Sequence, residues 1–163
     1  MELLRAVALV AATLTVGLMA GVFFLYAVAI MPGLGRAGDR TFVAAFQSID
    51  RAIINPVFLS GFFGALLFTG LAVVLHLPAE GRPVLPWTLA AFVLYLASFL
   101  LTVRVNVPLN DQIKAAGDPD RIDVAAVRAR LEAPWVRWNL VRTVLAVLAL
   151  GCLAWALVEY GRL

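Results

Sequence analysis

The sequence predicts an all-α integral membrane protein, a four-transmembrane-helix bundle with amphipathic helices in loops one and three. The first observation is compositional: 63% of the 163 residues are hydrophobic and only 14% are charged, whereas soluble domains are roughly 45–50% apolar and about 25% charged. The second is a set of four apolar segments, each long enough to cross a hydrocarbon core of about 30 Å as a helix. We therefore expect residues 1–163 to form a single integral membrane domain.

The four expected spans cover residues 6–30, 54–77, 86–105 and 139–158. The first resembles a signal peptide because Arg5 precedes its apolar run, but that run exceeds the roughly 7–15 residues usual for a cleaved signal. We expect it to remain as an uncleaved span. Asn55-Pro56 fits an N-cap and first turn for the second span, and Pro134 precedes the fourth.

The first loop carries an amphipathic pattern. Phe42, Phe46 and Ile49 recur at i, i+4 and i+7, which predicts a helix with one apolar face. We expect this helix to lie on the membrane or to cap the bundle.

The third loop repeats the pattern with Val124, Val127 and Leu131, after a helix-start signal at Asp118-Pro119. Gly117 is expected to separate this helix from the preceding segment, residues 106–111.

Two further expectations concern the same loop. Arg128 is expected on its exposed surface, and Pro134-Trp135 is expected to return the chain sharply into the fourth span.

The distribution of basic residues predicts the orientation. Loops one and three, with their flanks, hold ten of the thirteen basic residues. By the positive-inside rule these loops are cytoplasmic and both termini are outside. The net charge of +3 comes with no basic run, so we expect no nucleic-acid partner; the expected partners are the lipid bilayer and a hydrophobic small molecule.

Polar residues crowd at this one side of the membrane. Trp135, Trp138, Asn139 and Arg142 stand at i, i+3, i+4 and i+7, so a helix places all four on one face. An arginine in or near hydrocarbon is costly unless it is paired or hydrated, which makes it a functional candidate.

Chemistry assigns roles to these residues. Asp50 and Asp111 are the candidate general bases, and Arg104 and Arg142 are the candidate cations, one of which is expected to pair with one of these carboxylates. The alternative is that each of these residues only anchors the loops. The expected ligand contacts are Asn55, Asn106, Asn110, Trp135, Trp138 and Asn139.

A polar stripe on the third span leads to the same end. It consists of Tyr95, Ser98, Thr102 and Asn106, at i, i+3, i+7 and i+11. It fits either a pocket wall or interhelical hydrogen bonding, which holds membrane bundles together.

Metal ligands are scarce. The chain has one cysteine, Cys152, and one histidine, His76, which ends the second span on the opposite side. We predict no metal site and no cofactor, with haem or another redox cofactor kept as an alternative.

Two small-residue motifs allow close helix approach, Gly17 with Gly21 and Ser60 with Gly64. They fit packing inside the monomer, and the alternative is a homodimer seam.

The chain resembles the anthrone oxygenase-like family of small four-helix membrane proteins, formerly a domain of unknown function. The resemblance rests on four stretches in order: Met31-Pro-Gly-Leu34; Phe42 to Asp50 leading to Asn55-Pro56; Asn106-Val-Pro-Leu-Asn110; and Trp135-Val-Arg-Trp-Asn-Leu-Val-Arg142. The order and spacing of these stretches extend the resemblance over nearly the whole chain.

The resemblance implies a membrane oxidoreductase or oxygenase that acts on a hydrophobic aromatic or quinone-like molecule, using dioxygen. The alternative is a non-enzymatic membrane module that binds a small molecule or lipid, or a subunit of a larger membrane complex. A transporter is least favoured, because no pair of broken helices marks a site at the membrane midplane.

Overall fold

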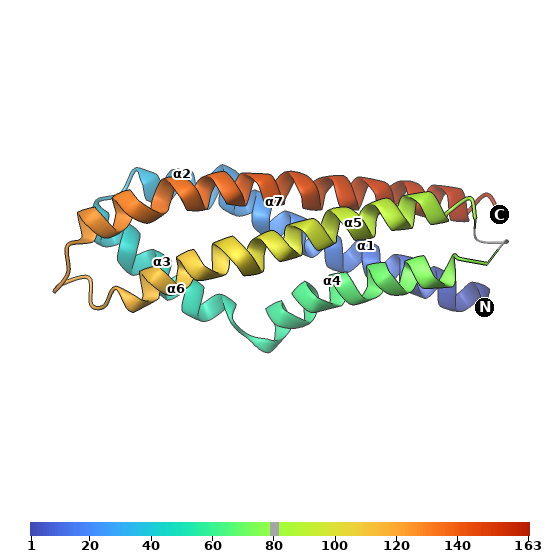
Figure 1. The fold of residues 1–163 in the computed structure, drawn as a ribbon, viewed down its shortest axis with the longest axis horizontal. Coiled ribbons are helices and arrows are strands. Elements are labelled where there is room, and N and C mark those ends of the chain that lie inside the picture. The colour runs from blue at the N-terminus through green and yellow to red at the C-terminus, as the bar shows by residue number, and fades with distance from the viewer. Residues whose placement is uncertain (79–81) are drawn as a thin grey trace.

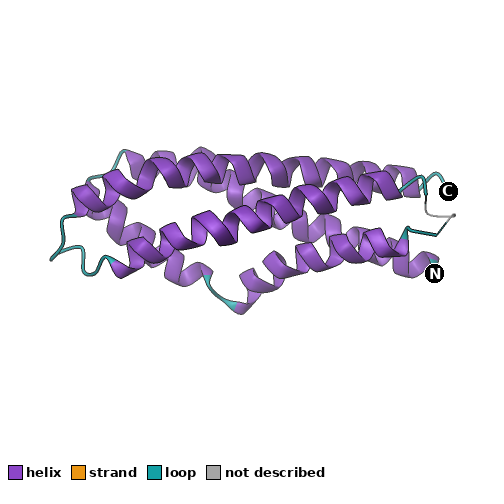
Figure 2. Cartoon of the chain, in the orientation of Figure 1, coloured by secondary structure: helices purple, strands orange, loops and turns teal. Residues whose placement is uncertain are grey.

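The computed structural model describes residues 1–78 and 82–163, and in this part of the chain the regular structure is entirely helical (Figure 2). Four continuous helical runs are long and apolar enough to cross a membrane. They are Glu2–Gly35, Pro56–Leu75, Leu85–Ala115 and Val124–Tyr160. The predicted fold class is therefore confirmed, although three of the four helices extend well beyond the expected spans.

The helices lie side by side, and both termini lie at one end of the bundle (Figure 1). The opposite end, called here the loop end, holds loops one and three. Loop one folds into α3 (Asp39–Ile53), and loop three connects α6 (Val107–Ala115) to α7 (Val124–Tyr160).

Two helices contain a π-helical turn where they approach the loop end. In the first, α1 (Glu2–Leu25) passes through Tyr26–Ile30 into α2 (Met31–Gly35). In the second, α5 (Leu85–Leu101) passes through Thr102–Asn106 into α6.

Each π turn ends two residues before a proline, Pro32 or Pro108. A proline ring crowds the carbonyl four residues earlier, and a wider turn at that position relieves the crowding. For this reason residues 106–111, expected to be a connection, instead continue the third span as a helix.

Helix α7 corrects two expectations. It begins after Asp123, whose side chain accepts a hydrogen bond of 3.0 Å from the backbone N–H of Ala126, and not at Asp118-Pro119. It then runs through Pro134 without a break. Leu131 and Trp135, on either side of this proline, are buried, so their packing holds the helix together despite the lost backbone hydrogen bond.

The amphipathic helix of loop one is confirmed as α3. Its Phe42 and Phe46 are buried in one apolar cluster with Ile113 of α6 and with Leu131 and Trp135 of α7. The helix therefore caps the bundle from the loop end.

Polar contacts fix this cap as well. The side-chain amide of Gln47 donates to the carbonyls of Ile113 and Gly117, at 2.9 and 3.0 Å, and satisfies the end of α6. Gly117 has a φ of +102°, which only glycine adopts readily, and the chain turns there from α6 towards α7.

Arg128 is not exposed as expected. Its guanidinium donates to the carbonyls of Gly35 and Ala37 and to the carboxylate of Asp39, at 2.8–2.9 Å, and it also pairs with Glu132. It thus joins α7 to the start of loop one.

The small-residue motifs pack partly within the chain. A Cβ at Gly17 would lie 3.6 Å from Leu150 of α7, and one at Gly64 would lie 3.7 Å from Thr15 of α1. Fully buried alanines, among them Ala12, Ala65 and Ala146, extend this close packing. The homodimer seam stays a prediction.

Candidate functional site

A cavity of about 240 Å³ lies where the membrane bundle meets the cap formed by α3. Its walls come from α1, its π turn and α2, from α3, from the start of α4 (Pro56–Leu75), from the second π turn and α6, and from α7. Most of the lining is apolar or aromatic. The aromatic residues that line it are Phe23, Tyr26, Phe46, Phe58, Phe62, Phe63 and Trp135.

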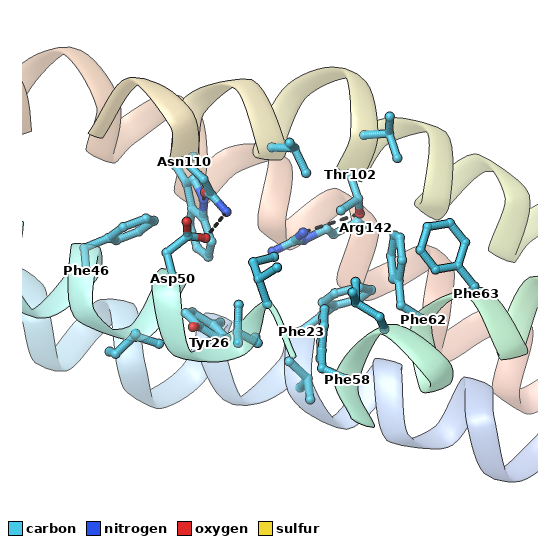
Figure 3. A pocket seen from close by; sticks show the side chains of 18 of the residues that line it. Phe23, Tyr26, Phe46, Asp50, Phe58, Phe62, Phe63, Thr102, Asn110 and Arg142 are labelled. Carbon is cyan, nitrogen blue, oxygen red and sulfur yellow. Dashed lines mark hydrogen bonds between the residues drawn. The ribbon is translucent and has the colours of Figure 1, made fainter. Parts of the chain in front are cut away.

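Four polar side chains also line the cavity: Asp50, Thr102, Asn110 and Arg142. Figure 3 shows Asp50 and Asn110 towards the loop end, Arg142 beside Thr102, and Phe62 and Phe63 towards the bundle.

Arg142 is 6% exposed and is held by α7 and α5. Its Nε and Nη2 donate to the side-chain oxygen of Asn139, at 3.0 and 2.9 Å, and its Nη1 makes a long contact of 3.4 Å with the hydroxyl of Thr102. Asn139 is itself fixed by donating to the carbonyl of Phe23 at 3.2 Å.

Aromatic rings flank the same guanidinium. Its central carbon lies 4.3 Å from the ring centroid of Phe23 and 5.3 Å from that of Trp135. Such contacts stabilise a cation by about 0.5–2 kcal/mol, but they do not neutralise it. Across the described residues, no carboxylate forms an ion pair with Arg142, so the expected Arg–Asp pair is absent.

Asp50 belongs to a separate polar network. Its Oδ1 accepts a hydrogen bond of 2.6 Å from the side-chain amide of Asn110, and Asn110 in turn accepts 2.7 Å from the indole N–H of Trp135. Lys114 Nζ lies 2.9 Å from Asp50 Oδ2 and forms an ion pair with it.

This network ties three elements together, namely α3, α6 and α7. It also keeps Asp50, which is 4% exposed, beside the positive charge of Lys114. Apart from this ion pair, Oδ2 has no polar partner among the described residues.

Asn106 is the one expected contact with an unexplained environment. It is fully buried, and neither its side-chain oxygen nor its nitrogen has a hydrogen-bond partner in the described chain. Unpaired buried amides are costly, and no contact among the described residues accounts for this one. Asn106 does not line the cavity.

The remaining expected site residues lie elsewhere. Arg104 is exposed, and Asp111 is a surface partner of Lys114 with its side chain 62% exposed. Asn55 caps α4 by accepting 3.0 Å from the N–H of Phe58. The ring of Trp138 contacts the guanidinium of its neighbour Arg137, whose central carbon lies 5.5 Å from the ring centroid. All four lie towards the loop end, as their sequence positions predicted, but none of them lines the cavity.

The structure adds residues that the sequence did not indicate. Tyr26 packs on Trp135 with ring centroids 5.4 Å apart, and Lys114 provides the counter-ion of Asp50. The only available signal was their spacing, because Lys114 lies one helical turn from Asn110 once residues 107–115 are read as a helix.

The polar stripe on α5 serves both expected purposes. Tyr95 donates to the carbonyl of Phe62 at 2.9 Å, and Ser98 donates to the carbonyl of Arg142 at 3.1 Å, so these two residues connect helices. Thr102 lines the cavity.

One side of the cavity is bordered by exposed apolar side chains. They are Ile54 and Phe63 near the start of α4, and Val103 and Val107 around the π turn of α5. Because these lining residues are exposed, this side of the cavity adjoins the outer surface of the helices.

A second buried polar group lies at the opposite end of the bundle. His76 is fully buried and its Nδ1 lies 2.7 Å from the carbonyl of Ala72; a carbonyl only accepts, so Nδ1 carries the proton. Burial lowers the pKa of His76 below its ordinary value, the charge of Arg5 lowers it further, and the hydrogen bond to Ala72 opposes both. No cluster of three or more metal-binding side chains occurs in residues 1–78 and 82–163.

Comparison with known families gives one match. The family described as anthrone oxygenase matches residues 56–152, which is more than half of the chain. The matched segment includes Asn110, Trp135, Asn139 and Arg142 but begins after α3 and Asp50. Searches of curated proteins and of solved structures found no match.

Proposed function

The chain belongs to the anthrone oxygenase family, and we propose from this membership and from its cavity that it is a membrane oxidoreductase that oxidises a hydrophobic aromatic or quinone-like molecule with dioxygen. The observation that supports the proposal is the presence of one buried carboxylate and one buried guanidinium on the same aromatic-lined cavity.

The proposed reaction starts with a proton transfer. Asp50 Oδ2 removes a proton from a methylene carbon activated by an adjacent aromatic ketone, and the negative charge delocalises onto the ketone oxygen. A positioned general base contributes about 10²–10⁴-fold to such a step. Arg142 donates hydrogen bonds to the developing oxyanion, in an apolar site where such stabilisation is strongest.

Oxidation follows at the same carbon. The carbanion attacks dioxygen, which is reduced to a peroxide bound to carbon and takes up one proton. Removal of the second proton from that carbon then breaks the O–O bond, so that a ketone forms and the distal oxygen leaves as water. One dioxygen is consumed for each quinone formed, and no further reductant is needed.

Asp111 and Arg104, the other two expected catalytic residues, play no part in this proposal because both are exposed outside the cavity. The exposed apolar border of the cavity supports a substrate that partitions into the membrane. We also propose that loops one and three, and therefore the loop end, face the cytoplasm.

The test is an assay of the purified protein in liposomes, with anthrone as the probe. Dioxygen uptake and quinone absorbance should rise together, in a one-to-one ratio and faster than in empty liposomes. Rates equal to those of empty liposomes would contradict the proposal. A haem or flavin absorption band in the purified protein would contradict the cofactor-free route and indicate oxidation by that cofactor.

A second candidate is a module that binds a small molecule without reaction. It is favoured by the unpaired charge of Arg142, which suits retention of an anion. Stoichiometric binding of an aromatic probe without dioxygen uptake would select this alternative.

A further inference from the structure

We infer that the ligand of this cavity is bound as a monoanion, with one ionised oxygen on the guanidinium of Arg142 and an aromatic body among Phe58, Phe62 and Phe63. The favoured class is an acidic phenol or enol. The inference rests on the cavity of the proposed function but concerns the resting complex, before any reaction.

The charges around the cavity are not balanced. Two of its lining residues carry opposite charges, Asp50 a negative one and Arg142 a positive one. Asp50 already has a cation, Lys114, at 2.9 Å. Arg142 has no carboxylate within ion-pair distance among the described residues, so the cavity keeps one positive charge without a partner.

Arg142 keeps hydrogen-bond donors that the described residues do not use. A guanidinium has five N–H groups. The bonds to Asn139 use Nε and one N–H of Nη2, and the long contact with Thr102 uses one N–H of Nη1. Two N–H groups therefore remain, one on each terminal nitrogen, and each can donate to an anionic oxygen.

The surroundings of the guanidinium favour a ligand with a single negative charge. Phe23 and Trp135 lie against the guanidinium, and a ligand reaches its remaining N–H groups from the cavity. An unpaired charge is expensive in an apolar site, and an anionic ligand removes that expense. Asp50 on the same cavity repels a second negative charge, which limits the ligand to one.

The aromatic side of the cavity fits the rest of such a molecule. The rings of Phe58 and Phe62 lie 6.1 Å apart and are nearly parallel, and Phe62 stacks on Phe99 at 4.7 Å. Phe63, at the apolar border of the cavity, is 55% exposed. A flat aromatic body can therefore enter from the membrane while its oxygen reaches Arg142.

The probe for the test is 2-naphthol, because its absorption spectrum distinguishes the neutral form from the naphtholate. With the detergent-solubilised wild-type protein, the midpoint of its ionisation should fall by at least about one pH unit relative to protein-free micelles, a tenfold preference for the anion. At pH values at which 2-naphthol is bound as the anion, its methyl ether 2-methoxynaphthalene, which cannot ionise, should bind at least about tenfold more weakly than 2-naphthol.

Three variants connect the effect to the guanidinium. Arg142→Met should return the midpoint to the micelle value and make the two probes bind equally, whereas Arg142→Lys should retain part of the shift. Arg130→Met, an exposed change on the same helix, should match the wild type. If Arg142→Met does not fold, Asn139→Asp provides the missing carboxylate beside Arg142 and should abolish the shift.

The outcomes are separable. An unshifted midpoint in the wild type overturns the inference. So does a shift that survives in folded Arg142→Met or, where that variant does not fold, in Asn139→Asp. Tighter binding of 2-naphthoic acid than of 2-naphthol overturns the phenol class in favour of a carboxylic acid. Naphtholate binding by a protein without oxidase activity refutes only the proposed function, whereas oxidation of a ligand bound in neutral form refutes only this inference.

Discussion

Asn110 donates a hydrogen bond of 2.6 Å to Asp50, and this contact joins the helix of loop one to the helix that extends the third span. The same amide accepts a hydrogen bond from Trp135 of α7. The candidate base is therefore positioned by two segments far apart in the sequence, and the cavity depends on the docking of loop one.

Replacing Asn110 by leucine tests this dependence. The change removes a donor to a buried carboxylate and the acceptor of a buried indole N–H, and each unsatisfied group costs about 1–3 kcal/mol. We expect a lower midpoint of thermal unfolding in detergent. Trp135→Phe, which removes only one of the two hydrogen bonds while keeping an aromatic ring, should lower the midpoint less. Equal midpoints for wild type and Asn110→Leu would show that the network does not stabilise the fold.

Replacing Asp50 by asparagine tests the proposed base. The amide keeps the size of the side chain but cannot accept the substrate proton, so the rate of anthrone-dependent dioxygen uptake should fall by about 10²–10⁴-fold. Asp111→Asn is the matched control, because that carboxylate also contacts Lys114 but is exposed, and it should retain nearly the wild-type rate. The reverse order of effects would assign the base to Asp111.

The sequence predicted the architecture because apolar runs and amphipathic spacing report burial directly. The helix in loop one was recognised from Phe42 and Phe46, and both are buried. The course of the third and fourth helices was not predicted, because the third span was ended with its apolar run and the chain was expected to turn sharply at Pro134. Tertiary packing around Pro134, and a π turn before Pro108, overrode that local signal.

The candidate site was predicted in part for a related reason. Helical periodicity correctly placed Trp135, Asn139 and Arg142 on one face of α7, and all three are buried. Periodicity could not say which residues of other helices meet them, so Arg104 was expected in the cavity and Lys114 was overlooked. The partner of each charge depends on the rotation of α6, which changes at the π turn.

Arg128 provides a test of the loop end. Arg128→Ala removes the hydrogen bonds to Gly35, Ala37 and Asp39. The acceptors of Ala37 and Asp39, both half-buried, are then unpaired, so loop one should detach more often. We expect faster amide hydrogen exchange in residues 36–46 and 124–131. Arg130→Ala, on an exposed position of the same helix, should leave exchange unchanged. Wild-type protection in Arg128→Ala would contradict the clamp.

The proposed orientation is tested by labelling a single cysteine. Asp120 lies in loop three with its side chain 60% exposed, so Asp120→Cys in a Cys152→Ser background should react with a membrane-impermeant maleimide only after cells are opened. A second reporter, Arg162→Cys near the C-terminus, should react in intact cells. Labelling of position 120 in intact cells would reverse the orientation.

His76 predicts a pH dependence at the other end of the bundle. Because its pKa is lowered in the folded protein, the unfolded chain takes up a proton first as the pH falls. Stability should therefore be constant above the unfolded value of about 6.5 and should decrease as the pH falls from there towards the folded pKa. His76→Phe keeps a ring against Tyr160, whose centroid lies 5.9 Å away, but cannot titrate. Thermal unfolding in detergent between about pH 5.5 and 7.5 should show this decrease in the wild type and a flatter profile in His76→Phe, even where the loss of the hydrogen bond to Ala72 lowers the whole curve. Two parallel profiles would mean that other groups cause the pH dependence.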